Sequence, residues 1–202
     1  MRKFLPWIIV GGLILISYFY IKGINNTAVT LDQDSQEAWG NVQTSYQRRN
    51  DLIGNLVETV KGAADFEKST LEAVTNARAS ASQVKIDPSN ITPEQLAQFN
   101  QAQSGVSSAL SRLLVTVEKY PELRANENFR MLQNELTSTE NQILTARTRF
   151  NEKVKQYNNH IKIFPNNLFA GMFGFKDKAF FEAATGAEKP VDVKFDFNNE
   201  KK

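Results

Sequence analysis

Residues 4–21 form one uninterrupted apolar run, and this run constrains the chain more than any other feature. It reads FLPWIIVGGLILISYFYI and contains no charged residue. As a helix rising about 1.5 Å per residue it would extend roughly 27 Å, close to the thickness of the hydrocarbon core of a bilayer. Lys3 and Lys22 flank the run. The run therefore predicts a transmembrane anchor, placed at residues 1–24, that contacts lipid through residues 4–21.

A cleaved signal peptide is the alternative interpretation of this segment. Secretory signals have an apolar core of about 7–15 residues, followed by a small-x-small cleavage site. This run is longer and ends in bulky aromatic residues, so it favours a retained anchor. The sequence contains no cysteine, which excludes a lipid-modified cysteine, disulfides and thiol catalysis.

Basic residues near the run indicate its orientation. Arg2 and Lys3 precede it, whereas the residues that follow Lys22 include Asp32 and Asp34. Basic residues favour the cytoplasmic side of a span. The expected topology is therefore a single pass with a cytoplasmic amino terminus and the rest of the chain outside the cytoplasm.

Composition limits the functions available to the remaining chain, which is long enough for one domain with a hydrophobic core. Lys and Arg number 24, and Asp and Glu number 22. This balance argues against a nucleic-acid surface, which needs an excess of basic residues. The chain has one histidine and no phosphate-binding loop, nucleophile motif or metal-ligand spacing. We therefore expect no enzyme activity, catalytic residue, cofactor or metal.

Apolar residues recur at three- and four-residue intervals through most of the chain, which predicts long amphipathic helices. Asp34 and Glu37 have the spacing of a capping box. We therefore expect the first helix over residues 34–84, followed by a loop over residues 85–91.

Two further long helices are expected. Thr92 and Gln95 form a second capping box, and Pro121 ends or kinks the helix that they begin. The next helix extends from Asn126 to Pro165. Long helices with short connections pack most simply as an antiparallel up-and-down bundle.

The end of the chain has a different pattern. Residues 166–186 predict a broken fourth helix, so the expected fold is all-α: an amino-terminal transmembrane helix followed, over residues 25–186, by a bundle of three long helices and a short fourth. A second copy of the chain is an alternative way to complete the bundle. Residues 187–202 contain the alternating stretch VDVKFDF and are interpreted as an extended tail, or alternatively as a strand that pairs with a partner's sheet.

Several polar and apolar positions are candidates for special roles. Arg49 and Glu67 occupy positions where apolar residues are expected, and a buried charge is costly unless it is paired. We interpret them as setting the register of the bundle, with Arg112 as the partner of Glu67; a polar binding site is the alternative. The segment LFAGMFGF at residues 168–175 is interpreted as core, and an exposed patch for a partner or membrane is the alternative.

A polar cluster, Tyr157, Asn158, Asn159 and His160, lies near the end of the third long helix. It is interpreted either as a contact surface or as a carboxyl-terminal cap with an asparagine in the left-handed conformation. We expect a hydrogen-bonding role for the histidine rather than a metal-ligand role.

Two long blocks resemble the LemA family. The first is YQRRNDLIGNLVETVKGAADFEKSTLEAVTNARA at residues 46–79, and the second is KYPELRANENFRMLQNELTSTENQILTARTRFNEKVKQYNNHIKIFP at residues 119–165. The sequence departs from the family pattern at Gly54, where proline is usual, and at Phe66, where histidine is usual. The candidate structural or interaction residues in these blocks are Arg48, Arg49, Asp51, Asn55, Glu67, Arg78, Arg147, Tyr157 and Asn158.

The resemblance implies a single-span protein of the bacterial inner membrane with a helical bundle and no known enzymatic activity. The first hypothesis is a scaffold or interaction domain for other, unidentified envelope membrane proteins. An accessory regulator of a membrane protease or of an envelope stress response is the alternative.

Overall fold

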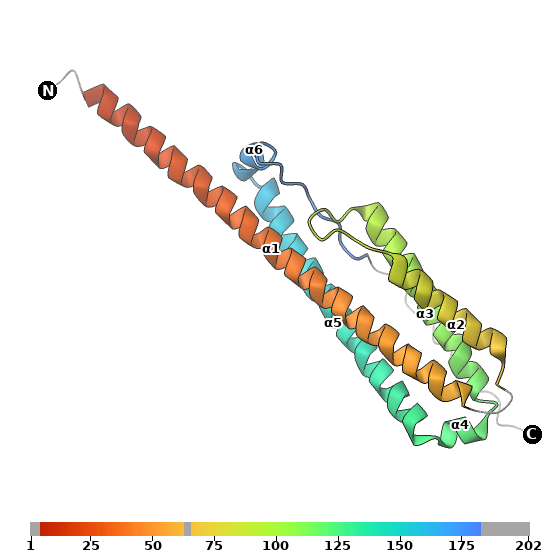
Figure 1. Cartoon of the computed structure of the whole chain (residues 1–202). Coiled ribbons are helices and arrows are strands. Elements are labelled where there is room, and N and C mark those ends of the chain that lie inside the picture. Colours follow the sequence, from red (N-terminus) through yellow and green to blue (C-terminus); the bar gives the residue numbers. More distant parts are fainter. Residues whose placement is uncertain (1–4, 63–65, 183–202) are drawn as a thin grey trace, which may run out of the picture.

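The computed structural model describes residues 5–62 and 66–182 as helices joined by short connections (Figure 1). The helices are α1 (Leu5–Lys61), α2 (Lys68–Gln83), α3 (Pro93–Val117), α4 (Pro121–Ala125), α5 (Glu127–Lys162) and α6 (Asn166–Ala170). These ranges contain no strand. The predicted all-α class is confirmed for the part of the chain described.

Helix α1 joins the apolar run to the bundle without a break. Its first part projects beyond the other helices (Figure 1), and the large apolar side chains between Trp7 and Tyr20 are exposed. In the described residues, α1 is the one helix long and apolar enough to cross a membrane. The expected helix start at Asp34 is wrong, because Ile24 and Ala28 follow helical spacing and are already buried against the bundle.

The predicted single helix over residues 34–84 is also wrong. Helix α1 ends at Lys61 and α2 begins at Lys68, so the chain turns back on itself between them. Val60, Phe66 and Leu71 nevertheless belong to one hydrophobic cluster. The apolar spacing continues on both sides of the turn, and for this reason the pattern alone did not reveal it.

Helices α1 and α5 form a long antiparallel pair, and α2 and α3 form a shorter one beside it (Figure 1). The expected boundaries of the later helices are close to those observed. Thr92 Oγ1 accepts a hydrogen bond from the Gln95 amide at 3.3 Å, and Gln95 Oε1 accepts one from the Thr92 amide at 3.1 Å. This capping box confirms the predicted start of α3. Pro121 begins the short helix α4 after α3 has ended.

The core follows the bundle axis as a series of clusters. Aliphatic residues of α1, α2 and α3, including Leu56, Val74 and Leu113, pack together at one end. Aromatic rings fill the middle, where Trp39 contacts Phe99 and Phe150 at centroid distances of 5.4 Å. A third, smaller cluster lies beside α6 and consists of Ala28, Tyr157, Ile161 and Ala170.

Residues 175–182, here called the C-terminal segment, leave α6 and lie along α5 without forming a helix. The predicted helix over residues 176–186 is therefore wrong for residues 176–182. The rest of that helix and the predicted tail at 187–202 lie outside the described residues. The core interpretation of residues 168–175 is wrong for Leu168, Met172 and Phe173, which are exposed.

Candidate functional site

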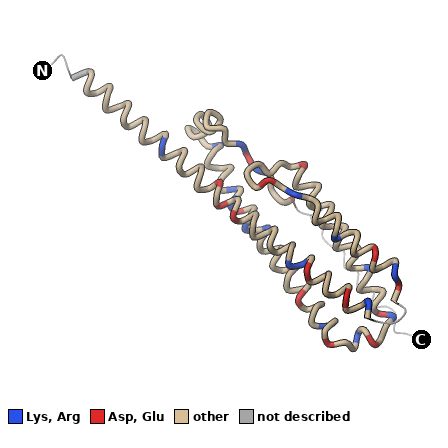
Figure 2. Tube along the Cα trace, in the orientation of Figure 1, with Lys and Arg blue, Asp and Glu red and all other residues tan. Residues whose placement is uncertain are grey.

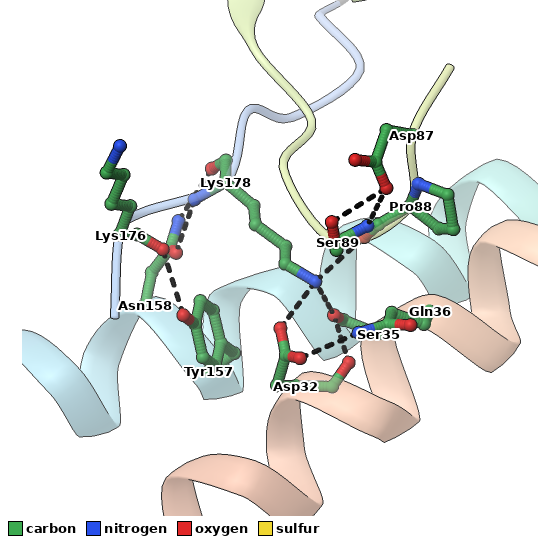
Figure 3. Close-up of polar contacts among 10 residues, drawn as sticks. All are labelled: Asp32, Ser35, Gln36, Asp87, Pro88, Ser89, Tyr157, Asn158, Lys176 and Lys178. Atoms are coloured by element: carbon green, nitrogen blue, oxygen red, sulfur yellow. Dashed lines mark hydrogen bonds and ion pairs between the residues drawn. The ribbon is translucent and has the colours of Figure 1, made fainter. Parts of the chain in front are cut away.

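A buried lysine of the C-terminal segment joins three parts of the chain (Figure 3). Lys178 is only 4% exposed, and its Nζ lies 2.6 Å from Asp32 Oδ1 of α1. Nζ also donates to Ser35 Oγ at 2.8 Å and to the Pro88 carbonyl oxygen at 3.0 Å. An ammonium group has three N–H donors, so each of them has an acceptor. We call this set the Lys178 junction, and its geometry is that of a structural link.

Two asparagines of α5 bind the backbone of the C-terminal segment. Asn158 Nδ2 donates to the Lys178 carbonyl at 2.8 Å, and its Oδ1 accepts from the Lys178 amide at 2.9 Å. Asn151 makes the same pair of bonds to Phe181, each at 2.9 Å. The asparagines are seven residues apart, so they lie on one face of the helix. Their amide groups satisfy backbone groups that would otherwise be unpaired.

Tyr157 lies beside this junction. Its hydroxyl donates to the Lys176 carbonyl at 2.9 Å, and Lys178 Nζ lies 5.3 Å from the centre of its ring (Figure 3). Burial raises the pKa of Tyr157 to about 12, and the charge of Asp32 adds to the effect. Tyr157 and Asn158 are both buried within α5. The cap interpretation of this cluster is therefore wrong.

Replacing Tyr157 with phenylalanine is expected to reduce the free energy of unfolding at neutral pH by about 1 kcal/mol, the net value of one hydrogen bond. The folded-state pKa of about 12 lies above the ordinary 10.0, so the stability linked to this proton is present below pH 10 and is lost as pH rises towards 12. Urea unfolding at pH 7 and pH 11 tests this. The wild type should lose more stability than Tyr157→Phe over this interval, and equal losses would contradict the expectation.

Arg49 forms a second buried site, between α1, α3 and α5. The side chain is 3% exposed, and Nη1 lies 3.1 Å from Glu140 Oε1. Its guanidinium also donates to Ser107 Oγ and to Gln103 Oε1, and it lies 4.9 Å from the Tyr46 ring centre. These contacts agree with the prediction that a charge at this position is paired.

Arg147 lies next to Arg49, on the wall of the same cavity of about 230 Å³. Its guanidinium carbon is 4.4 Å from the centre of the Phe181 ring. Burial raises the pKa of the Tyr46 hydroxyl in this cavity, whereas the charges of Arg147 and Arg49 oppose that shift. The structure therefore brings two of the predicted residues together at one place.

Other predicted residues lie on surfaces. Arg48 pairs with Glu135 at 2.8 Å, and about half of its side chain is exposed. Asp51 Oδ1 accepts a hydrogen bond from Gln47 at 2.9 Å, and Asn55 is exposed on α1. Among the described residues, no hydrogen bond or ion pair joins any two of these three.

The guanidinium of Arg78 packs against the backbone at Gly54. A side-chain Cβ at residue 54 would lie 2.8 Å from Arg78 Nη2, so the absence of a side chain makes room for this contact. Helix α1 continues through Gly54. Gly54, which departs from the family pattern, and Arg78, a candidate structural residue, are therefore neighbours in the fold.

The interpretation of Glu67 as a buried register residue is wrong. Glu67 is exposed at the amino-terminal end of α2, where the turn between α1 and α2 places it outside a helix. Its Oε1 accepts a hydrogen bond from Ser69 Oγ at 2.6 Å. Glu67 and Arg112 line the same surface cavity, but no ion pair joins them among the described residues.

Sequence reasoning missed Lys178, Asp32 and Asn151. Lys178 lies in a polar stretch far along the chain from Ser35, so no local pattern indicates its burial. Asn151 precedes Asn158 by seven residues, which places the two on one face of a helix, but this spacing alone does not show what they bind. His160, as expected, makes a hydrogen-bond contact: its Nε2 lies 3.0 Å from the Ile24 carbonyl oxygen.

Comparison with known proteins gives the family. Two magnetosome proteins of Paramagnetospirillum magneticum, MamQ 1 and MamQ 2, are each 28% identical over 183 residues, which cover 82% of this chain and 67% of theirs. Protein LemA of Metamycoplasma hominis is 24% identical over 178 residues, or 88% of this chain and 78% of its own. The LemA family pattern matches residues 38–195. The chain therefore belongs to the LemA family.

Proposed function

We propose that this protein is a non-enzymatic, membrane-anchored interaction domain whose bundle lies outside the cytoplasm of a bacterial cell. The observation that carries the proposal is the continuity of α1, which extends from the exposed apolar run into the packed bundle over Leu5–Lys61. Because the helix is unbroken, the position and direction of its apolar part determine those of the part that belongs to the bundle. The bundle would therefore stand at a fixed height and angle on the membrane.

The buried charges support a structural interpretation of the bundle. Arg49 and Lys178 are each held by acceptors from more than one element. Groups engaged in this way hold helices in register. The surface, rather than the interior, is therefore the part of the bundle available to partners.

One surface groove fits this role. It lies between α1 and α5 on a stretch where both helices present small polar side chains, and its volume is about 510 Å³. Small residues allow another backbone to approach closely, and hydroxyl and amide groups provide hydrogen bonds. The residues that line the groove are Ala38, Asn41, Thr44, Ser45, Ser138, Asn141, Gln142, Thr145, Ala146 and Arg149.

A photo-cross-linking residue placed at Thr145 tests the proposal in living cells, with the exposed Gln101 of α3 as the matched control position. A scaffold should give cross-links to several membrane proteins from Thr145 and few from Gln101. Cross-links to a single protease would favour the regulatory alternative. Equal patterns at both positions would contradict a role for the groove.

The orientation is tested separately, because the chain has no cysteine. Met131→Cys introduces one thiol at an exposed position of α5. A membrane-impermeant maleimide should label this thiol in intact cells. Labelling only after lysis would place the bundle in the cytoplasm and overturn the proposed topology.

A further inference from the structure

Large apolar side chains gather at the turn around α6. Residues 163–173, here called the α6 turn, expose Phe164 at 79%, Met172 at 70% and Leu168 at 63%. Ile163 and Phe173 of the same turn are also exposed, at 56% and 42%. Exposed apolar residues elsewhere on the bundle are separated along its long helices, as is normal for a protein surface. The exposed apolar side chains of the α6 turn are therefore a distinct feature, because they gather at one end of the bundle.

The α6 turn is held in place by buried contacts. Asn166 Nδ2 donates to the His160 carbonyl at 2.9 Å, and the Phe175 amide donates to the Ala170 carbonyl at 3.0 Å. Ala170 packs against Ala28 of α1. The backbone is thus fixed, and the apolar side chains are presented outwards.

The height of the α6 turn along α1 is given by the antiparallel pairing with α5. His160 Nε2 lies 3.0 Å from the Ile24 carbonyl, three residues beyond the end of the apolar run. Helix α5 continues for two more residues, to Lys162, which moves the chain about 3 Å further towards the amino end of α1. The α6 turn begins at the next residue, so it starts beside the end of the run. Beside a membrane crossed by α1, this level is the headgroup layer, which occupies about 5–7 Å on each side of the hydrocarbon core.

We infer that the α6 turn is a second membrane contact, which inserts its apolar side chains into the interface of the bilayer that α1 crosses. The inference rests on the proposed spanning role of α1. It follows from the continuity of two apolar surfaces: the exposed run of α1 ends where the apolar surface of the turn begins. Figure 2 shows this first part of α1 nearly free of charge, in contrast to the bundle.

Lysines at the same end suit this position. Lys22 is exposed at the end of the apolar run. Lys162 is also exposed, at the end of α5, where its Nζ pairs with Asp177 Oδ2 at 2.9 Å. Long basic side chains near a membrane surface extend their charges towards the headgroups. The bundle would then be held at two points, by α1 and by the α6 turn, which fixes its rotation about α1.

Spin labels on single cysteines test the inference in the full chain, reconstituted into vesicles of phosphatidylcholine and phosphatidylglycerol. The variants are Leu168→Cys in the α6 turn, Met131→Cys as an exposed apolar control at the other end of α5, and Ile14→Cys in the span. Frequent collisions of a spin label with molecular oxygen indicate that the label lies in lipid, and frequent collisions with a nickel chelate indicate that it lies in water. Circular dichroism of each labelled variant verifies that the fold is retained.

The expected result is that oxygen dominates at positions 14 and 168, whereas the nickel chelate dominates at position 131. If position 168 resembles position 131 while position 14 resembles lipid, the second contact is refuted and the anchor stands. If position 14 is also accessible to the nickel chelate, α1 is outside the bilayer, and both the inference and the proposed anchoring fail.

Discussion

Replacing Lys178 with methionine is expected to reduce the free energy of unfolding of the bundle by about 3 kcal/mol, within the range for removing one partner of a buried ion pair. Methionine keeps the apolar stem and removes the ammonium group. The change leaves Asp32, Ser35 and the Pro88 carbonyl without their common donor. Urea unfolding in detergent, followed by helical circular dichroism, measures the loss.

Lys176→Met is the matched control for this prediction. Lys176 lies two residues away in the same segment and is exposed, and its contact with Tyr157 uses the backbone carbonyl rather than the side chain (Figure 3). Its replacement should change stability by less than about 0.5 kcal/mol. Asp32→Asn should cost less in the Lys178→Met background than in the wild type, because the two residues share one interaction. Additive effects would show that the junction does not couple the segment to α1.

Features set by neighbouring residues were predictable from the sequence. The capping box of Thr92 and Gln95 requires only residues three apart, and it begins α3 as expected. The apolar run likewise forms part of one helix. Periodicity was less informative about helix ends, because Val60 and Val74 keep a spacing of two heptads although α1 ends and α2 begins between them.

Contacts between distant residues were predictable only in part. The cost of burying an unpaired charge indicated that Arg49 needs a partner. Its partner, Glu140, lies 91 positions away in the sequence, and no local pattern identifies Glu140 as that partner. The Lys178 junction joins residues 143 positions apart. The sequence of its segment resembles a short helix that ends at Gly186. The two asparagines of α5 instead bind its backbone in an extended form.

Replacing Arg49 with alanine is expected to cost about 2–3 kcal/mol, because the buried acceptor Gln103 loses its charged donor, whereas Glu140 is 47% exposed and can be hydrated. Three acceptors on α3 and α5 lose their donor, and Gln103 is itself buried. The adjacent Arg48 provides the control, because its ion pair with Glu135 is about half exposed on each side. Exposed pairs contribute about 1 kcal/mol or less, so Arg48→Ala should have a small effect. Urea unfolding of both variants under the same conditions gives the comparison.

A rescue variant separates the loss of polar pairing from a general loss of packing at Arg49. Arg49→Met combined with Gln103→Leu removes both buried polar groups and restores apolar volume, and such exchanges are often neutral. The double variant should therefore recover most of the stability lost in Arg49→Ala. If it is as unstable as the alanine variant, the hydrogen-bonded arrangement between α1 and α3 is itself required. If Arg48→Ala and Arg49→Ala are equally stable, Arg49 does not join the three helices in solution.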